Sequence, residues 1–214
     1  MSPLLDDLTL PETLMAFLHT DDGQVRQSVR PVHLTAAAEL GELALDGHVD
    51  IEDDGSVTLL ESEHAPSRPW VEVALAELSE HPTTVERWVR GRRDAVQVQQ
   101  RAALERGVLS KDRGRFLGFI GYDRHLVAPQ LREDLLGDLE APGAEEVPRA
   151  AALAALLTTP AMRRALRFDG DRVERLTALA STAEDAVDPG PMFRTMDYAI
   201  ATAVAGVVLG GSGD

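Results

Sequence analysis

Residues 42–61, ELALDGHVDIEDDGSVTLLE, contain the pattern that decides the fold. The stretch begins as a helix that ends at Gly47, because glycine readily adopts the left-handed conformation that follows a helix C-terminus. Apolar and polar residues then alternate around Asp54-Gly55, the dipeptide that favours a two-residue hairpin turn. The sequence therefore predicts a helix over 34–45 followed by a short β-hairpin.

The same pattern returns in residues 104–119, LERGVLSKDRGRFLGF. Gly107 ends a helix expected over 94–106. A second short hairpin is expected after it, with Val108 and Leu109 on one arm and Phe116, Leu117 and Phe119 on the other.

The rest of the chain has helical patterns. Aromatic residues make up only 4% of the 214 residues, which favours packed helices over a β-sandwich. Further helices are expected after a Thr9 cap, over 70–78, around Trp88, and over 129–139, 148–158, 160–167, 171–184 and 192–209. Trp70 and Trp88 are expected in the core. No connection is long enough for a domain linker, so we predict a mainly α, single-domain helical bundle over 1–214. It would have a buried apolar C-terminal helix and two short β-hairpins.

Several classes of protein are disfavoured by composition. The chain has no cysteine, which excludes disulfides, thiolate metal sites and a cysteine nucleophile. Its N-terminus is acidic where a secretory signal would be basic, so we expect a cytoplasmic protein. The most apolar run, Tyr198–Gly211, is shorter than the roughly 20 residues that span a bilayer. The six histidines show no metal-ligand spacing and no phosphate loop is present, so no enzyme, metal site or cofactor is predicted.

Two other interpretations of the helix and hairpin in residues 42–61 compete with a solvent-exposed hairpin. A winged-helix DNA-binding domain also pairs a helix with a hairpin, but this hairpin carries five acidic residues and no base, so it would repel phosphate. We expect no nucleic acid partner. A calcium loop would use Asp50, Glu52, Asp54, Gly55 and Glu61 at EF-hand positions, yet Gly47 ends the incoming helix early. The solvent-exposed acidic hairpin is the favoured interpretation.

The order of motifs resembles the Golgi phosphoprotein 3 family. The matching pieces are LTLPETLMAFL, ELALDGHV, TTVERWV and LERGVL, followed by the alanine- and leucine-rich 150–157 and the apolar C-terminal helix. The resemblance implies a mainly helical, non-enzymatic adaptor: eukaryotic members bind phosphatidylinositol 4-phosphate on Golgi membranes and retain glycosyltransferases. The family's lipid pocket uses a tryptophan and several arginines. Their positions fall near Gln27, Ala36, Arg93 and Val96, so only Arg93 keeps its residue type.

A basic strip lies in the middle of this acidic chain. Between Arg87 and Arg115 there are nine basic and three acidic residues, against a formal net charge of −15 for the whole chain. If Arg90, Arg92 and Arg93 cluster, their guanidinium groups could bind a phosphate bidentately. We therefore expect these three residues to dock an anionic phospholipid headgroup, or else an acidic protein partner, peripherally on the membrane. The alternatives are that the arginines pair with nearby carboxylates, or that the protein is a soluble interaction module; homo-oligomerisation is left open.

Overall fold

α-Helices dominate the computed structural model, which describes residue 5 and residues 7–52, 54–62, 65–116 and 120–185. The helices are α2 (Leu10–Leu18), α3 (Pro31–Leu45), α4 (Pro69–Glu80), α5 (Val85–Gly91), α6 (Ala95–Glu105), α7 (Pro129–Leu139), α8 (Pro148–Leu157), α9 (Pro160–Leu166) and α10 (Gly170–Asp185), with 3₁₀ turns η1 (Gln27–Val29) and η2 (Ala144–Glu146). The predicted mainly α class is confirmed. The helix expected over 192–209 lies outside the described residues.

Local signals set most helix starts. The Thr9 hydroxyl accepts a hydrogen bond from the Glu12 amide at 3.4 Å, and the Glu12 carboxylate accepts one from the Thr9 amide at 2.9 Å. This capping box satisfies two amides that the first turn would otherwise leave unpaired. One proline occupies the first or second position of α2, α3, α4, α7, α8 and α9, where its missing N–H costs nothing. The start of α3 at Pro31, three residues before the predicted one, follows from this rule.

The predicted first hairpin is present, and a third strand extends it. β1 (Val49–Ile51) pairs antiparallel with β2 (Ser56–Leu59), with Val49 opposite Leu59. The unpredicted β3 (Thr83–Thr84) then pairs with β2. Because β1 and β2 form a hairpin immediately after a helix C-terminus, this segment does not have the helix–loop–helix geometry of a calcium loop.

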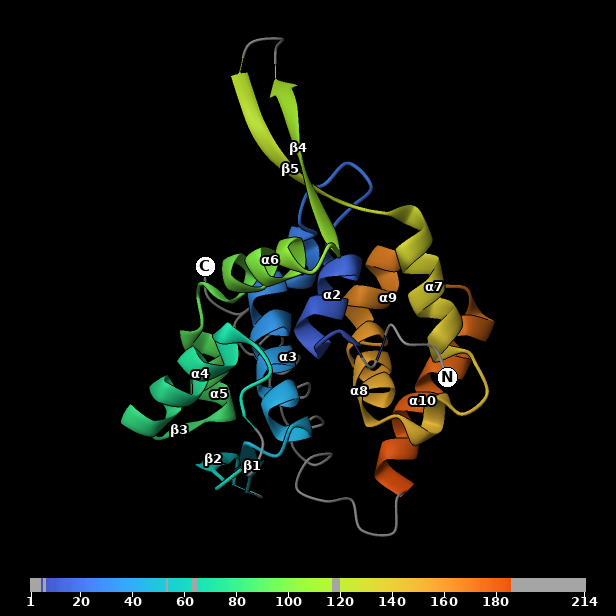
Figure 1. Cartoon of the computed structure of the whole chain (residues 1–214). Helices are drawn as coiled ribbons and strands as arrows, with labels where there is room; N and C mark the ends of the chain where they lie inside the picture. The colour runs from blue at the N-terminus through green and yellow to red at the C-terminus, as the bar shows by residue number, and fades with distance from the viewer. Residues whose placement is uncertain (1–4, 6, 53, 63–64, 117–119, 186–214) are drawn as a thin grey trace, which may run out of the picture.

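The second hairpin is longer than predicted, and its turn lies elsewhere. β4 (Leu109–Phe116) runs antiparallel to β5 (Ile120–Val127), with Leu109 opposite Val127, and projects away from the helices (Figure 1). Phe116 therefore ends the first arm rather than starting the second, which corrects the predicted arms; Leu117 and Phe119 lie outside the described residues. The strands are long because β4 pairs along its whole length with residues 120–127. The prediction considered only residues up to 119 and therefore did not contain the second strand.

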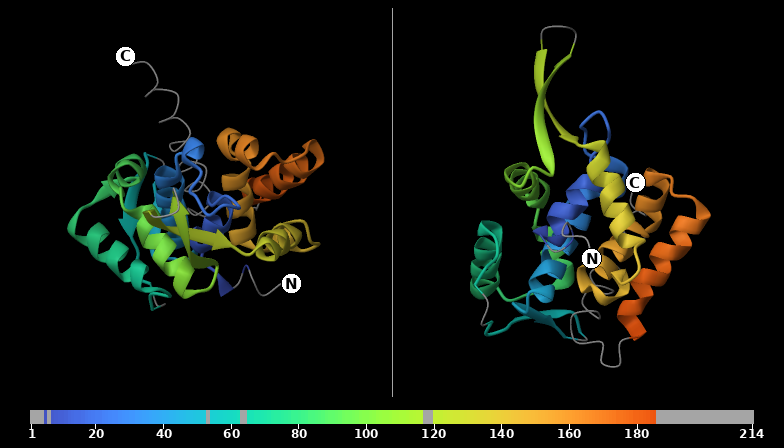
Figure 2. Two further views of the ribbon diagram at one scale, coloured as in Figure 1. Left: turned by 90° about the horizontal axis from the view of Figure 1, so that it is seen from above. Right: turned by 45° about the vertical axis from the view of Figure 1, so that its right-hand side comes forward.

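Two groups of buried side chains hold the helices together. α2 is the central helix, since every residue from Leu10 to Leu18 is buried. One core joins α2 to α7, α8 and α10, and the other joins α3 to α4, α5 and the β1–β2 hairpin. Figures 1 and 2 show the second group on one side of α2 and α3, and α7–α10 on the other. Trp70 and Trp88 are 5% and 3% exposed, which confirms their prediction as core residues.

Candidate functional site

Trp88 fixes the start of the basic strip against the second core. Thr84 caps α5 through a hydrogen bond from the Arg87 amide to its hydroxyl, at 3.3 Å. One turn later the Trp88 indole N–H donates to the Ala36 carbonyl on α3, at 3.1 Å. This bond sets the rotation of α5 on α3 and therefore decides which residues after Trp88 face inward.

Arg92 faces inward. Its Nε and Nη2 donate to the Glu39 carboxylate at 2.9 and 3.3 Å, and its Nη1 donates to Glu77 at 3.1 Å. The guanidinium lies 5.0 Å from the centroid of the Trp88 ring, within the range of a cation–π contact. The side chain of Arg92 is only 6% exposed and that of Glu39 is fully buried.

Burial and pairing act in opposite directions on this ion pair. Burial raises the pKa of Glu39, while the bonds from Arg92 and Gln99 oppose that rise. Burial also disfavours the Arg92 cation, but its bonds to Glu39 outweigh this effect and raise the pKa of Arg92. Arg92 therefore keeps its positive charge inside the protein, where the Glu39 carboxylate accepts its hydrogen bonds.

The three predicted headgroup residues do not form one accessible cluster. Arg92 is occupied by Glu39 and Glu77, which corrects the expectation for this residue. Arg90 is exposed and forms an ion pair with Glu86 one turn away, at 2.9 Å, and Arg93 is exposed beyond the end of α5. Ion pairs this exposed add little stability, so the Arg90 charge stays available to a stronger anionic partner.

Sequence reasoning missed an electrostatic link between Arg90 and the start of α3. Arg30 and Arg90 both act electrostatically on His33, since burial first and then these two cations lower the pKa of His33. Arg30 precedes α3 with φ +54°, and His33 lies in its first turn. We call Arg30, His33 and Arg90 the basic corner. The charge pattern of the sequence gives no sign that residues 30 and 90 act on the same histidine. They do so because α5 packs against α3.

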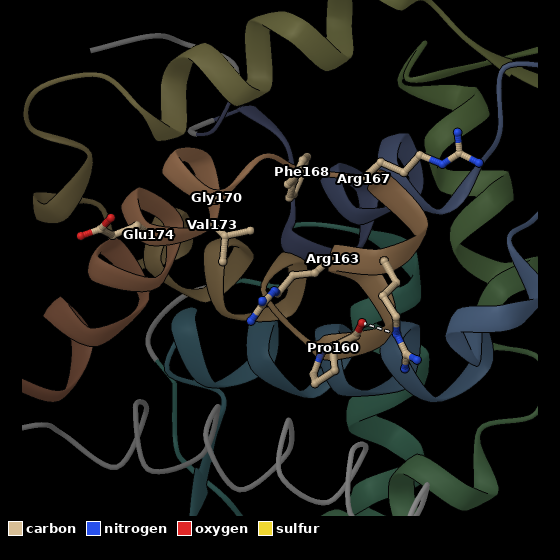
Figure 3. Close-up of a pocket in the computed structure, with 8 residues that line it drawn as sticks. Pro160, Arg163, Arg167, Phe168, Gly170, Val173 and Glu174 are labelled. Atoms are coloured by element: carbon tan, nitrogen blue, oxygen red, sulfur yellow. Dashed lines mark hydrogen bonds between the residues drawn. The ribbon is translucent and has the colours of Figure 1, made fainter.

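Arginines of α9 add to this side of the protein. The Arg26 guanidinium, just before η1, donates to the Ala165 carbonyl on α9 at 3.2 Å, and η1 leads directly into Arg30. Arg163, Arg164 and Arg167 line an open pocket at the end of α9, and none forms an ion pair with another described residue. Figure 3 shows Arg163 and Arg167 pointing in different directions. They can therefore add positive charge to an extended face but do not converge on one small anion.

A separate groove lies between α4 and α6. Its apolar lining includes Trp70, Val73, Val98 and Ala102, and its volume is about 440 Å³. Arg68 closes one end through an ion pair with the buried Glu12 at 2.9 Å. The groove therefore combines an apolar floor with charged ends.

The described histidines, aspartates and glutamates do not gather into a group that could hold a metal ion. His19, the most buried histidine of the chain's described part, is fully paired: its Nδ1 is 2.9 Å from the Met15 carbonyl and its Nε2 is 3.0 Å from the Gln100 amide nitrogen. Glu42, the second buried carboxylate of α3, accepts bonds from the Leu10 amide at 2.7 Å and from Arg149 at 2.7 Å. These groups are explained by packing.

Comparison with known proteins agrees with the sequence resemblance. None of the helices in the described ranges is long and apolar enough to cross a membrane. No curated protein gave a match. The family model described as Golgi phosphoprotein 3 (GPP34) matches residues 10–206. Because this match covers most of the 214 residues, the chain belongs to the Golgi phosphoprotein 3 family.

Proposed function

We propose that the protein is a non-enzymatic peripheral adaptor that docks an anionic phospholipid headgroup at the basic corner, with Arg93 beside it. The proposal is carried by the electrostatic effect of Arg30 and Arg90 on His33 in the first turn of α3, where both cations add to burial in lowering the pKa of His33. The family is generally one of non-catalytic adaptors, and the resemblance implies phosphatidylinositol 4-phosphate as the ligand class.

The start of α3 suits an anion for a second reason. The aligned peptide dipoles of a helix place partial positive charge at its N-terminus, which favours phosphate. α3 is 15 residues long, and its first turn contains no acidic residue and no side-chain cap. A headgroup phosphate at the basic corner would therefore meet a helix N-terminus and two guanidinium groups together.

The expected affinity is modest. Near an anionic bilayer each basic residue adds about 1 kcal/mol, so Arg30, Arg90 and Arg93 together supply about 3 kcal/mol. Arg163, Arg164 and Arg167 on neighbouring α9 would strengthen the attraction. The formal charge of −15 opposes it at distances below the Debye length, about 10 Å at 0.1 M salt. We therefore expect reversible binding that weakens steeply with salt.

Vesicle co-sedimentation tests the proposal. Wild type should pellet with vesicles containing phosphatidylinositol 4-phosphate at low salt, and much less with neutral vesicles. An Arg30→Gln, Arg90→Gln, Arg93→Gln variant should lose most of this binding. The matched control, Arg101→Gln, Arg113→Gln, Arg175→Gln, removes the same charge at exposed positions on α6, β4 and α10 and should retain it. Equal loss in both variants would show a dependence on net charge alone and would refute the basic corner as a site.

Equal, negligible pelleting of wild type under every condition would reject the lipid function itself. The second candidate, a soluble module that binds an acidic protein, would then be favoured, because the same exposed arginines can meet carboxylates. A gel shift on duplex DNA at low salt tests the winged-helix alternative; we expect no retardation, since the β1–β2 hairpin carries acids where phosphate contacts would be needed.

A further inference from the structure

The β4–β5 hairpin meets the helices at a buried histidine. His19 follows the last residue of α2 and is fully buried. Its Nε2 lies 3.0 Å from the amide nitrogen of Gln100 on α6. Its ring contacts the ring of His125 on β5 edge to face, with the two centroids 6.0 Å apart. One side chain therefore lies where α2, α6 and the hairpin come together.

The hydrogen bonds of His19 fix its protonation state. Nδ1 lies 2.9 Å from the Met15 carbonyl oxygen, which can only accept, so Nδ1 carries the hydrogen. In the neutral ring Nε2 then accepts a hydrogen bond from Gln100. A proton on Nε2 would face the amide hydrogens of Gln100 and break this bond. Rotating the amide would offer its oxygen instead, but the new positive charge would still be buried.

The charged groups around His19 disfavour this proton. Burial is the largest cause that lowers the pKa of His19; the bond to the Met15 carbonyl opposes it, and His125 and Arg132 of α7 lower the pKa further. Asp21 already binds Arg132 at 2.7 Å, and Asp22 accepts a hydrogen bond from the Thr20 hydroxyl. The other charged side chains of these elements are engaged or lie elsewhere: Arg26 donates to backbone carbonyls, Lys111–Asp123 and Arg124–Asp112 pair within the hairpin, Glu133 and Asp134 of α7 are exposed, and Arg101 and Glu105 line the groove beside α4. A protonated His19 would therefore be a buried cation beside two bases.

The contact between β5 and the loop of residues 20–25 is the weakest one at this junction. The His125 amide donates to the Gly23 carbonyl at 3.2 Å, and Figure 1 shows this loop beside the foot of the hairpin. Residues 124–126 are only partly buried, whereas α2 is buried throughout. Local opening begins where the fewest groups are buried, so this contact should open before α2 does. Leu109 and Val127 lie in the first core and keep the hairpin attached.

We propose that His19 is a pH-sensitive latch, whose protonation opens the contact between β5 and the loop while the helices stay folded. This proposal does not depend on headgroup binding. In the opened state His19 regains the ordinary histidine pKa of about 6.5, whereas burial lowers the pKa of His19 in the closed state. The closed state is therefore fully favoured above pH 6.5 and loses stability as the pH falls below it. At pH 5.5, about one unit lower, the opened population rises at most about tenfold.

Native-state hydrogen exchange followed by NMR tests the latch, with rates corrected for the intrinsic pH dependence of exchange. Protection of the His125 amide should fall several-fold between pH 7.5 and pH 5.5, with a ceiling of about tenfold. Its exchange should depend little on low concentrations of urea, because the opening is local. The amide of the buried Leu156 in α8 should show the steep urea dependence of global unfolding. An equally steep dependence at His125, or no protection there at pH 7.5, would overturn the proposal.

Two variants separate the latch from a general loss of stability in acid. Gln100→Glu places a carboxylate beside Nε2, so it should raise the pKa of His19 above its ordinary value and keep the His125 amide protected at pH 5.5. His19→Gln removes the titrating group and should give equal protection at both pH values. His81→Gln, at the exposed end of α4, is the matched control and should keep the wild-type fall. NMR titration of the His19 ring checks the pKa directly. A raised pKa in Gln100→Glu with an unchanged fall in protection would refute the latch, as would an unchanged fall in His19→Gln.

Discussion

The pair formed by Arg92 and Glu39 is expected to be structural, and removing the arginine alone tests this. In Arg92→Met, the fully buried Glu39 would lose both bonds from the guanidinium and keep only the Gln99 amide, at 2.8 Å. Breaking a buried pair from one side typically lowers stability by about 3 to 5 kcal/mol, because the remaining charge stays buried. We expect a loss of this size in urea unfolding followed by circular dichroism at neutral pH. The Met variant would also lose the contact of Arg92 with Trp88.

Two comparisons make the experiment decisive. Arg93→Met changes the neighbouring, exposed arginine and should alter stability by less than about 0.5 kcal/mol. Arg92→Met, Glu39→Leu should recover most of the loss, because replacing both members of a buried pair is often nearly neutral. Glu77 needs no replacement, since it is half exposed and remains solvated.

The pH dependence of the Arg92→Met deficit has a defined sign. Burial raises the pKa of Glu39 above its usual value of 4.5, and loss of Arg92 removes a bond that opposes this rise. A carboxyl group with a raised folded pKa destabilises the fold while it is ionised. The penalty is greatest above the folded pKa and is relieved as the pH falls through it toward 4.5. The gap between Arg92→Met and Arg93→Met should therefore narrow in acid. A deficit below about 1 kcal/mol at neutral pH, or one that widens in acid, would refute the reasoning.

Three further predictions follow from local geometry. Thr9→Ala removes one half of the capping box and should lower the free energy of unfolding by about 0.5 to 2 kcal/mol in urea titrations. Gly23→Ala should destabilise by more than 1 kcal/mol and increase amide exchange at His125, because Gly23 has φ +80° and a Cβ would lie 3.0 Å from Arg124 and Leu126; an unchanged midpoint would contradict this. Burial lowers the pKa of His19, so the unfolded chain binds a proton at this histidine before the folded protein does. The free energy of unfolding should therefore keep its full His19 contribution above pH 6.5 and fall as the pH drops below it. His19→Gln should flatten that slope, and a slope equal to the wild type would exclude His19 as its cause.

Helix positions were predictable because their signals are local. Pro129 and Pro148 start helices where the sequence predicted them, since proline's fixed φ suits the first turn and its missing N–H is not needed there. Gly47 and Gly107 end α3 and α6 in the left-handed conformation, with φ of +68° and +75°. The hairpin around Asp54-Gly55 follows the same logic, although its turn is longer than the predicted two residues, because Ile51 pairs with Val57 and the Glu52 amide donates to the Ser56 carbonyl. Each of these predictions depends on residues within one turn of the chain.

The site could be predicted only in part, because its members are far apart in the sequence. The basic strip between Arg87 and Arg115 was recognisable as a charge excess. That Arg92 faces Glu39, 53 positions earlier, follows from the rotation of α5 on α3. A signal was present in Glu39, a charged residue on an alanine- and leucine-rich helix, which indicates a buried partner without identifying it. The length of the β4–β5 hairpin was missed for a similar reason, since its second strand, Ile120–Val127, lies beyond the 104–119 motif.

By itself, the sequence determined the mainly helical architecture, the helix ends and the family, since these depend on hydrophobic periodicity, proline and glycine placement, and the order of short motifs. The tertiary structure alone decided where the arginine charges act: it buries Arg92 against Glu39 and lets Arg30 and Arg90 act electrostatically on His33. The physical reason is that electrostatic energy depends on burial and on distance in space. Residues adjacent in the chain can therefore differ completely in what their charges can do.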